Sequence, residues 1–171
     1  MGGDRLKVLH PFPPLYDAAS QILILGSFPS VRSREQRFFY GHPQNRFWRV
    51  TAAVFDCAVP QTVDEKRAFL LKNRIALWDV IASCEITGSS DSSIRNVVPN
   101  DLSVILSAAP VRQIFVNGGT AAKYYEKHQQ KQTGIPAVRL PSTSPANAAW
   151  PLSRLTEAWT CIRITEPARE P

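Results

Sequence analysis

The sequence has few of the residues that build metal centres or disulfide frameworks. It contains three cysteines, three histidines and one methionine in 171 residues. The cysteines lie far apart and form no CxxC pair, which argues against a disulfide framework, a zinc ribbon or an iron–sulfur cluster. We expect all three to be small buried hydrophobic residues: Cys57, Cys84 and Cys161. The histidines form no recognisable ligand set, so we expect no metal site and no organic cofactor.

Long apolar runs and several catalytic signatures are also missing. No stretch is long enough to span a bilayer, and the N-terminus lacks the charged-then-apolar pattern of a signal peptide. We therefore expect a soluble protein of the cytoplasm with no membrane partner. The sequence contains no GxxxxGKS/T phosphate loop, no GxGxxG after a strand, no HExxH and no GxSxG. The nucleotide, metalloprotease and serine hydrolase sites that those motifs mark are therefore disfavoured.

Negative charge is in the minority. Lys and Arg outnumber Asp and Glu by 20 to 14, which gives a formal charge of +6 and a pI near 9.5. This charge suits a polyanionic partner such as nucleic acid, although an enzyme that happens to be basic fits it equally well. Five arginines crowd into one segment that is also rich in aromatic residues: Arg32, Arg34, Arg37, Arg46 and Arg49.

The length predicts a single domain over residues 1–171. Residues 1–20 are rich in proline and predict an extended arm on the surface, and residues 165–171 predict a frayed tail. Four short apolar runs have the character of buried strands, at residues 21–25, 74–80, 112–116 and 136–140. Helical patterns follow them, with Thr62 and Asp64 as candidate caps. This alternation predicts an α/β three-layer sandwich with a central four-stranded parallel sheet flanked by helices.

The polar motifs of the sequence lie in the segments that follow the predicted strands. GSFPS occupies residues 26–30, YGHPQNRFW residues 40–48 and PSTSPAN residues 141–147, with SSDSSIRNVVPNDL at residues 89–102. The ligand crevice of an open α/β sheet lies at the carboxyl ends of its strands. These motifs, in this order and over about residues 8–163, resemble the uracil-DNA glycosylase superfamily, and most closely its hypoxanthine-DNA (deoxyinosine) glycosylase branch.

The resemblance implies a DNA repair glycosylase, and we expect it to be monofunctional because no lysine in the motif loops is placed to form the Schiff base that a lyase needs. Such an enzyme flips a deaminated base, foremost hypoxanthine, out of double-stranded or single-stranded DNA and hydrolyses its N-glycosidic bond, which leaves an abasic site. It would work as a monomer without cofactor or metal. Two alternatives remain open: a mismatch-specific uracil-DNA glycosylase, and a non-catalytic nucleic-acid-binding protein of the same fold.

The first motif departs from that of the mismatch-specific and uracil-specific relatives, which carry Asn or Asp where this sequence has Phe28. A phenyl ring cannot orient water, so we expect the catalytic role to fall to Asn45. Its amide can accept from a water and donate to the base or sugar, although Asn is also a common helix cap. Ser27 is the second catalytic candidate.

The resemblance also implies which residues contact the base and the DNA. Tyr40 would stack on the flipped base, and the base-binding group consists of Gly26, Phe28, Tyr40 and Asp91. The last loop would contact phosphates and wedge into the duplex, and the predicted DNA contacts are His42, Arg46, Ser142, Ser144, Pro145 and Ala146. Leu140 stands where many relatives carry a His, which favours a purine over uracil.

Overall fold

The computed structural model describes residues 6–163 and contains the predicted parallel sheet. Its four strands lie in the order β3-β2-β6-β7, and all three neighbouring pairs are parallel. The bounds are β2 Ile22–Gly26, β3 Ile75–Asp79, β6 Gln113–Asn117 and β7 Ala137–Leu140. Every residue of β2 and β3 is buried, which explains why these strands are continuous apolar runs in the sequence.

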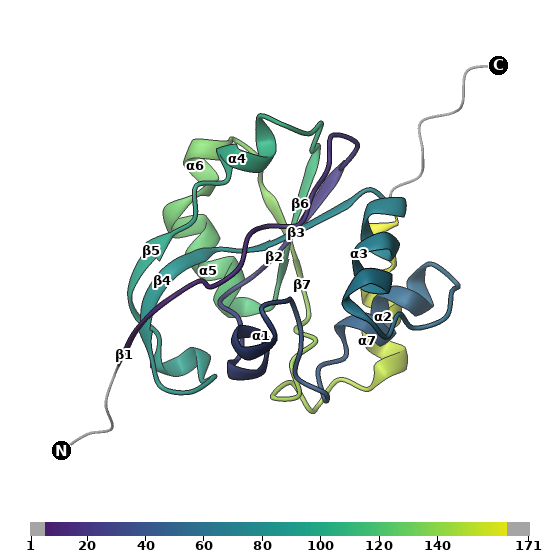
Figure 1. The fold of residues 1–171 in the computed structure, drawn as a ribbon, viewed down its shortest axis with the longest axis horizontal. Coiled ribbons are helices and arrows are strands. Elements are labelled where there is room, and N and C mark those ends of the chain that lie inside the picture. Colours follow the sequence, from purple (N-terminus) through teal and green to yellow (C-terminus); the bar gives the residue numbers. More distant parts are fainter. Residues whose placement is uncertain (1–5, 164–171) are drawn as a thin grey trace.

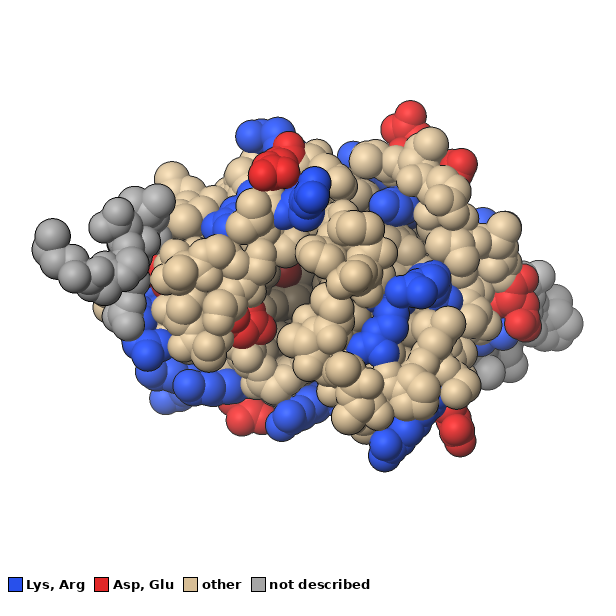
Figure 2. Space-filling view, turned by 90° about the horizontal axis from the view of Figure 1, so that it is seen from below, with Lys and Arg blue, Asp and Glu red and all other residues tan. Residues whose placement is uncertain are grey.

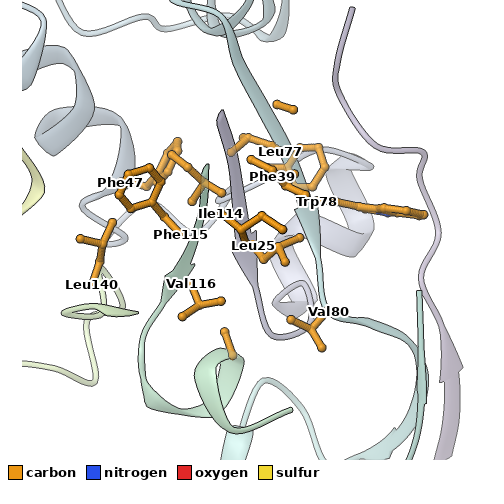
Figure 3. Close-up of a cluster of buried hydrophobic side chains, with 14 of the residues drawn as sticks. Leu25, Phe39, Phe47, Leu77, Trp78, Val80, Ile114, Phe115, Val116 and Leu140 are labelled. Atoms are coloured by element: carbon orange, nitrogen blue, oxygen red, sulfur yellow. The ribbon is translucent and has the colours of Figure 1, made fainter. Parts of the chain in front are cut away.

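Helices cover both faces of this sheet, as predicted. One side carries α2 (Phe47–Val54), α3 (Val63–Lys72) and α7 (Leu152–Trp159), and the other carries α4 (Ser103–Leu106), α5 (Gly119–His128) and α6 (Gln130–Thr133) (Figure 1). The short helix α1 (Val31–Gln36) follows β2. Side chains from the sheet and from α2 meet in the buried cluster of Figure 3, where Leu25, Phe47 and Phe115 are among those drawn. Thr62 caps α3 as predicted, because its hydroxyl accepts from the Glu65 N–H at 3.0 Å.

A second, antiparallel sheet was not predicted. It pairs β1 (Leu6–Leu9), β4 (Ile81–Ile86) and β5 (Arg95–Pro99) in the order β1-β4-β5. Only Val80 separates the end of β3 from the start of β4. One nearly continuous segment therefore belongs to both sheets, and Asp79 lies at the junction.

The prediction of a surface arm over residues 1–20 is wrong for the part that the structure describes. Beyond β1, Phe12 and Leu15 are buried, at 6% and 3% exposed. Leu15 also exchanges two backbone hydrogen bonds of 2.9 Å with Leu77 of β3. Prolines restrict the backbone but do not prevent neighbouring apolar side chains from entering the core. The first five residues and the predicted tail at 165–171 lie outside the described residues.

The expectation that all three cysteines are buried is correct only for Cys84, whereas Cys57 and Cys161 are exposed. Cys84 lies in β4, and burial raises the pKa of its thiol to about 11. The thiol of Cys84 is therefore protonated at neutral pH and chemically quiet.

The strand order explains where a ligand can enter. The chain leaves β2 toward β3 on one side and later fills β6 on the other side. The connection after β2 leads toward β3, whereas the connection after the neighbouring strand β6 leads the opposite way toward β7. Such a topological switch point opens a crevice at the carboxyl ends of the strands. These ends lie at the lower edge of the molecule in Figure 1. Across residues 6–163, no helix is both long enough and apolar enough to cross a membrane.

Candidate active site

A cavity of about 520 Å³ lies at the carboxyl ends of the parallel strands. Figure 2 shows this face of the molecule, with a hollow that contains acidic atoms. All of the predicted site residues except Arg46 line the cavity: Gly26, Ser27, Phe28, Tyr40, His42, Asn45, Asp91, Ser142, Ser144, Pro145 and Ala146. The cavity is also lined by polar residues that were not predicted as part of the site, among them Asp79, Asn117 and Thr143. Segments that are distant in the sequence therefore form one site.

Asn45 stands just before α2, and its side chain is fixed by two hydrogen bonds. Oδ1 accepts from the backbone N–H of Phe47 at 2.9 Å and from the hydroxyl of Thr143 at 2.9 Å. The Phe47 N–H can only donate, so the amide oxygen must face it. Nδ2 has no hydrogen-bond partner within the described part of the chain. Asn45 thus supports the helix start with its oxygen and keeps a donor for a ligand, so the two predicted roles are compatible.

Thr143 and Asn117 hold Asn45 in place. The Asn117 amide donates to the Thr143 hydroxyl at 3.0 Å, and its oxygen accepts from the Thr143 N–H at 3.1 Å. Thr143 is fully buried. The end of β6, the loop after β7 and the start of α2 are therefore joined by one hydrogen-bond network. In the sequence, Asn117 stands at the end of a predicted strand and Thr143 lies inside the PSTSPAN motif. Neither position indicates that the two side chains bond to each other.

Ser27 and Asp91 form a second pair in the cavity. The Ser27 hydroxyl lies 3.2 Å and 3.3 Å from the two carboxylate oxygens of Asp91, to which it donates. Burial raises the pKa of Asp91, and the charge of Asp79 adds to this rise, whereas hydrogen bonds from Ser27 and Thr120 oppose it. One predicted catalytic residue and one predicted base-binding residue therefore act as a unit.

Tyr40 is packed more tightly than the sequence suggested. Its ring stacks on Phe47 with centroids 4.0 Å apart and 15° between the planes, so stacking on a base must use the other face. The hydroxyl is buried and has no partner of good geometry among residues 6–163. Burial is the main cause that raises the pKa of Tyr40, followed by the charge of Asp79, while the nearby Asn117 side chain opposes the rise. The phenol is therefore neutral at physiological pH.

Asp79 lies at the bottom of the site, paired with His10. His10 Nε2 is 2.7 Å from Asp79 Oδ2, and the two side chains are 4% and 6% exposed. The pairing of β1 with β4 brings His10 here, since its N–H donates to the Ala82 carbonyl at 2.8 Å. Sequence reasoning missed both residues, because Asp79 ends an apolar run and His10 lies in the proline-rich segment. Across the described residues, no three His, Cys, Asp or Glu side chains are grouped to hold a metal ion.

Gly26 makes room for the Asp79 carboxylate. A Cβ at position 26 would lie 2.4 Å from Asp79 Oδ1 and 3.2 Å from the Tyr40 hydroxyl. The first of these distances is a collision with a buried and hydrogen-bonded side chain. Position 26 therefore requires glycine, because the Asp79 carboxylate occupies the space that a side chain would need. This explains why the predicted base-binding residue Gly26 is a glycine.

The loop after β7 carries hydroxyls and an exposed tip. Ser142 Oγ accepts from the Ser144 N–H and Ser144 Oγ accepts from the Ala146 N–H, each at 3.1 Å. Both hydroxyl hydrogens thus remain available to donate to DNA phosphates. Pro145 and Ala146 are exposed at the tip, where the predicted wedge would need them.

Arg46 and His42 border this loop. The Arg46 guanidinium donates to the carbonyls of Ser144 and Asn147 at 3.0 Å and also to that of Trp150. Arg46 therefore holds the loop from behind and does not line the cavity, so the DNA contact predicted for it stays a prediction. His42 Nδ1 accepts from the Gln44 N–H at 3.1 Å, which leaves Nε2 for a DNA contact.

The comparisons with known proteins agree with this geometry. Residues 13–163 match the family model of the Uracil DNA glycosylase superfamily, and the chain belongs to that superfamily. It is 36% identical over 153 residues to a hypoxanthine DNA glycosylase of Methanosarcina acetivorans, covering 88% of this chain and 95% of the relative. A hypoxanthine DNA glycosylase of Methanosarcina barkeri is 34% identical over 115 residues, covering 66% of this chain and 73% of the relative.

A solved structure gives the same result for the fold. The solution NMR structure of a proposed uracil DNA glycosylase from Methanosarcina acetivorans superimposes with a TM-score of 0.76 at 35% sequence identity. The match covers 89% of this chain and 94% of that chain. The predicted fold class and the predicted family are therefore confirmed.

Proposed function

We infer that this protein is a monofunctional DNA glycosylase that removes hypoxanthine from DNA by hydrolysing the N-glycosidic bond. The observation that carries this function is the position of Asn45, whose amide is locked by its oxygen with its nitrogen left to donate in the cavity. The similarity to two hypoxanthine DNA glycosylases over most of the chain supports the choice of base.

The chemistry follows from the groups that line the cavity. The flipped base enters it, a water oxygen bonds to C1′ of the sugar, and the N-glycosidic electron pair leaves with the base. The proton that the water loses is finally taken up by the departing base, so the products are a neutral base and an abasic sugar. Negative charge then develops on the base, so a fixed donor such as Asn45 Nδ2 lowers the barrier. Asp91, held by Ser27, offers its remaining lone pairs to the water or the base edge.

The DNA itself is held at the rim of the cavity. The hydroxyls of Ser142 and Ser144 donate to phosphates, and Pro145 and Ala146 enter the space that the flipped base leaves. His42 contacts a phosphate through Nε2. The enzyme acts as a monomer on double-stranded or single-stranded DNA and is found with DNA in the cytoplasm.

Excision assays on a panel of oligonucleotides test this function. Single- and double-stranded DNA carrying deoxyinosine, deoxyuridine or only normal bases is incubated with the protein and then treated with alkali, which cleaves at abasic sites. Cleavage of deoxyinosine is expected. No cleavage of deoxyinosine in any pairing would overturn the assignment, and salt-sensitive binding without any product would indicate a non-catalytic binder.

Uracil is the second candidate base. The superimposed Methanosarcina acetivorans structure is that of a proposed uracil DNA glycosylase, which favours it. Cleavage of deoxyuridine alone in the same panel would establish uracil in place of hypoxanthine.

A further inference from the structure

We propose that Arg34 of α1 is a positioning residue of the active site, because it ties the Phe28 ring to the loop that carries Asp91. The assignment rests on the proposed function, since it concerns how the same cavity is held in shape around a base. Arg34 does not line the cavity itself. In the sequence it stood out only as one of five clustered arginines, and α1 lies at the lower edge of Figure 1, where the parallel strands end.

The guanidinium of Arg34 makes two contacts, and they reach two separate parts of the cavity wall. Nη2 donates to the backbone carbonyl of Gly88 at 2.8 Å. The central carbon of the same group, Cζ, lies over the Phe28 ring, 5.6 Å from its centroid. Phe28 belongs to the first motif, whereas Gly88 belongs to the loop between β4 and β5, from which residues 89–92 line the cavity. One side chain therefore connects the two segments.

The shape of this group explains why an arginine occupies the position. A guanidinium is planar, so its edge can donate a hydrogen bond while its face covers an aromatic ring. The ammonium of a lysine is a compact, strongly hydrated point charge and cannot satisfy both contacts at once. Arg34 is half-buried, and a contact between a cation and a ring strengthens as water is removed from it. The two contacts therefore depend on the guanidinium and not on charge alone.

A second contact joins the same helix to the same loop. The N–H of Val31, the first residue of α1, donates to the hydroxyl of Ser89 at 2.9 Å. Val31 and Arg34 are three residues apart, so both lie on one face of the helix. The helix is therefore attached to the loop at two neighbouring points, Gly88 and Ser89, and the loop cannot turn about a single contact.

The loop depends on this attachment because several of its own hydrogen bonds close within it. The Ser93 hydroxyl donates to the Ser90 carbonyl at 2.6 Å and accepts from the Thr87 N–H at 2.9 Å. Such bonds fix the shape of the loop but not its place on the protein. Contacts from outside the loop set that place, and they include those from α1 and the bond from Ser27 to Asp91.

Loss of the Arg34 contacts should act on the reaction more than on DNA binding. The predicted DNA contacts lie at positions 42 and 46 and in the loop after β7, and none belongs to α1 or to the loop between β4 and β5. Phe28 and Asp91, in contrast, were predicted to contact the flipped base. A shift of about 1 Å in the groups around a reacting base can lower the rate about 10²-fold. Arg34 therefore differs from a phosphate-binding arginine, whose loss weakens binding to damaged and undamaged DNA alike.

The test separates the rate of excision from the affinity for DNA. Arg34→Lys keeps the charge and removes the planar group. In single-turnover assays on the damaged base that the protein excises fastest, the maximal rate should fall about 10- to 100-fold, whereas the enzyme concentration that gives half of this rate should change less than about 3-fold. Arg32→Lys, at an exposed position of the same helix, is the matched control and should leave both unchanged. A merely structural role would lower the melting temperature without changing the rate measured well below it.

Hydrogen exchange provides a measurement that needs no catalysis. Exchange in residues 87–94 should be faster in Arg34→Lys than in the unaltered protein, while exchange in the four parallel strands should be unchanged. If Arg34→Lys does not fold, Arg34→Gln, which retains an amide donor but lacks the cation, is measured in its place with the same expectations. An unchanged maximal rate, an equal loss of rate and affinity, or unchanged exchange in the loop would overturn the role of Arg34. If the unaltered protein excises no base at all, the proposed function fails, and the exchange result still decides whether Arg34 holds the loop.

Discussion

The Thr143 hydroxyl donates to Asn45 Oδ1 across 2.9 Å, although 98 residues separate the two in sequence. This contact ties the loop that would bind DNA to the amide that would act on the base. A movement of this loop on DNA binding would therefore change the hydrogen bond that Asn45 accepts. The Phe47 N–H, which can only donate, fixes the orientation of the same amide and leaves Nδ2 as its free end.

Two substitutions of Asn45 separate its structural role from its chemical one. Asn45→Asp keeps an oxygen for the Phe47 N–H and for Thr143 but removes the Nδ2 donor, whereas Asn45→Ala removes both. Excision should fall about 10²- to 10³-fold in each variant, as for other lost transition-state donors. The free energy of unfolding should fall by about 1 kcal/mol in Asn45→Ala only. Single-turnover excision and urea unfolding measure the two effects, and full activity in Asn45→Asp would leave Asn45 as a helix cap alone.

Removing the Tyr40 hydroxyl should not weaken the fold. The group is buried without a partner of good geometry in the described structure, and such groups cost about 1–3 kcal/mol. We expect Tyr40→Phe to match or exceed the thermal stability of the unaltered protein. Tyr40→Leu, which removes the ring, should weaken binding of DNA with a flipped base by about 1–3 kcal/mol and affect undamaged DNA less. A clear loss of stability in Tyr40→Phe would show that the hydroxyl has a partner after all.

Asp91 should make stability depend on pH in a specific direction. Its pKa is raised in the folded protein, mainly by burial, so the folded state holds this proton more tightly than the unfolded state. The free energy of unfolding therefore falls as pH rises from 3.8, the ordinary carboxyl pKa, to the raised pKa of Asp91 in the folded protein. Above that raised pKa the loss of stability is complete and stays constant. Asp91→Asn should be the more stable protein at pH 7, with an advantage that vanishes below pH 3.8. Calorimetry of both proteins between pH 3 and pH 7 measures this difference. A stability advantage of Asp91→Asn that grows toward acid pH would contradict a raised pKa of Asp91.

Arg46 should act on DNA through the loop that it holds. Its guanidinium reaches three carbonyls of the segment 144–150, and the compact ammonium of a lysine cannot reproduce that fork. Arg46→Lys should speed hydrogen exchange in residues 141–150, lower the free energy of unfolding by about 1–3 kcal/mol, and slow excision. Arg49→Lys, a change at an exposed position of α2, the helix that begins directly after Arg46, is the matched control. Unchanged exchange in Arg46→Lys would mean that the loop is ordered without it.

The parallel sheet was predictable because strands buried on both faces leave uninterrupted apolar runs, as in Ile22–Gly26. The loops after those strands were predictable as a site because the strand ends must meet at one edge. The second sheet was not predictable, since β5 is largely exposed, ends in a proline and contains Asn96 with a φ of 53°. Local sequence carries no strand signal there.

The inner part of the site was hidden for a related reason. The contact between His10 and Asp79 spans 69 residues, and it exists only because β1 pairs with β4. A proline-rich segment gives no indication that it carries a buried histidine. Asp79 resembles a simple strand end until the cavity beside it is known. Residue type and spacing thus predicted the rim of the cavity, whereas its floor required the three-dimensional contacts.

The pairing of β1 with β4 places His10, near the beginning of the chain, against a residue that lines the cavity. A version of the protein that starts after residue 10 would retain every loop motif and the whole parallel sheet, yet it would leave Asp79 Oδ2 without the imidazole nitrogen that lies 2.7 Å from it. Shortening the chain past His10 therefore changes the surroundings of a residue that lines the cavity, and such a truncation calls for the same controls as a substitution in the cavity itself.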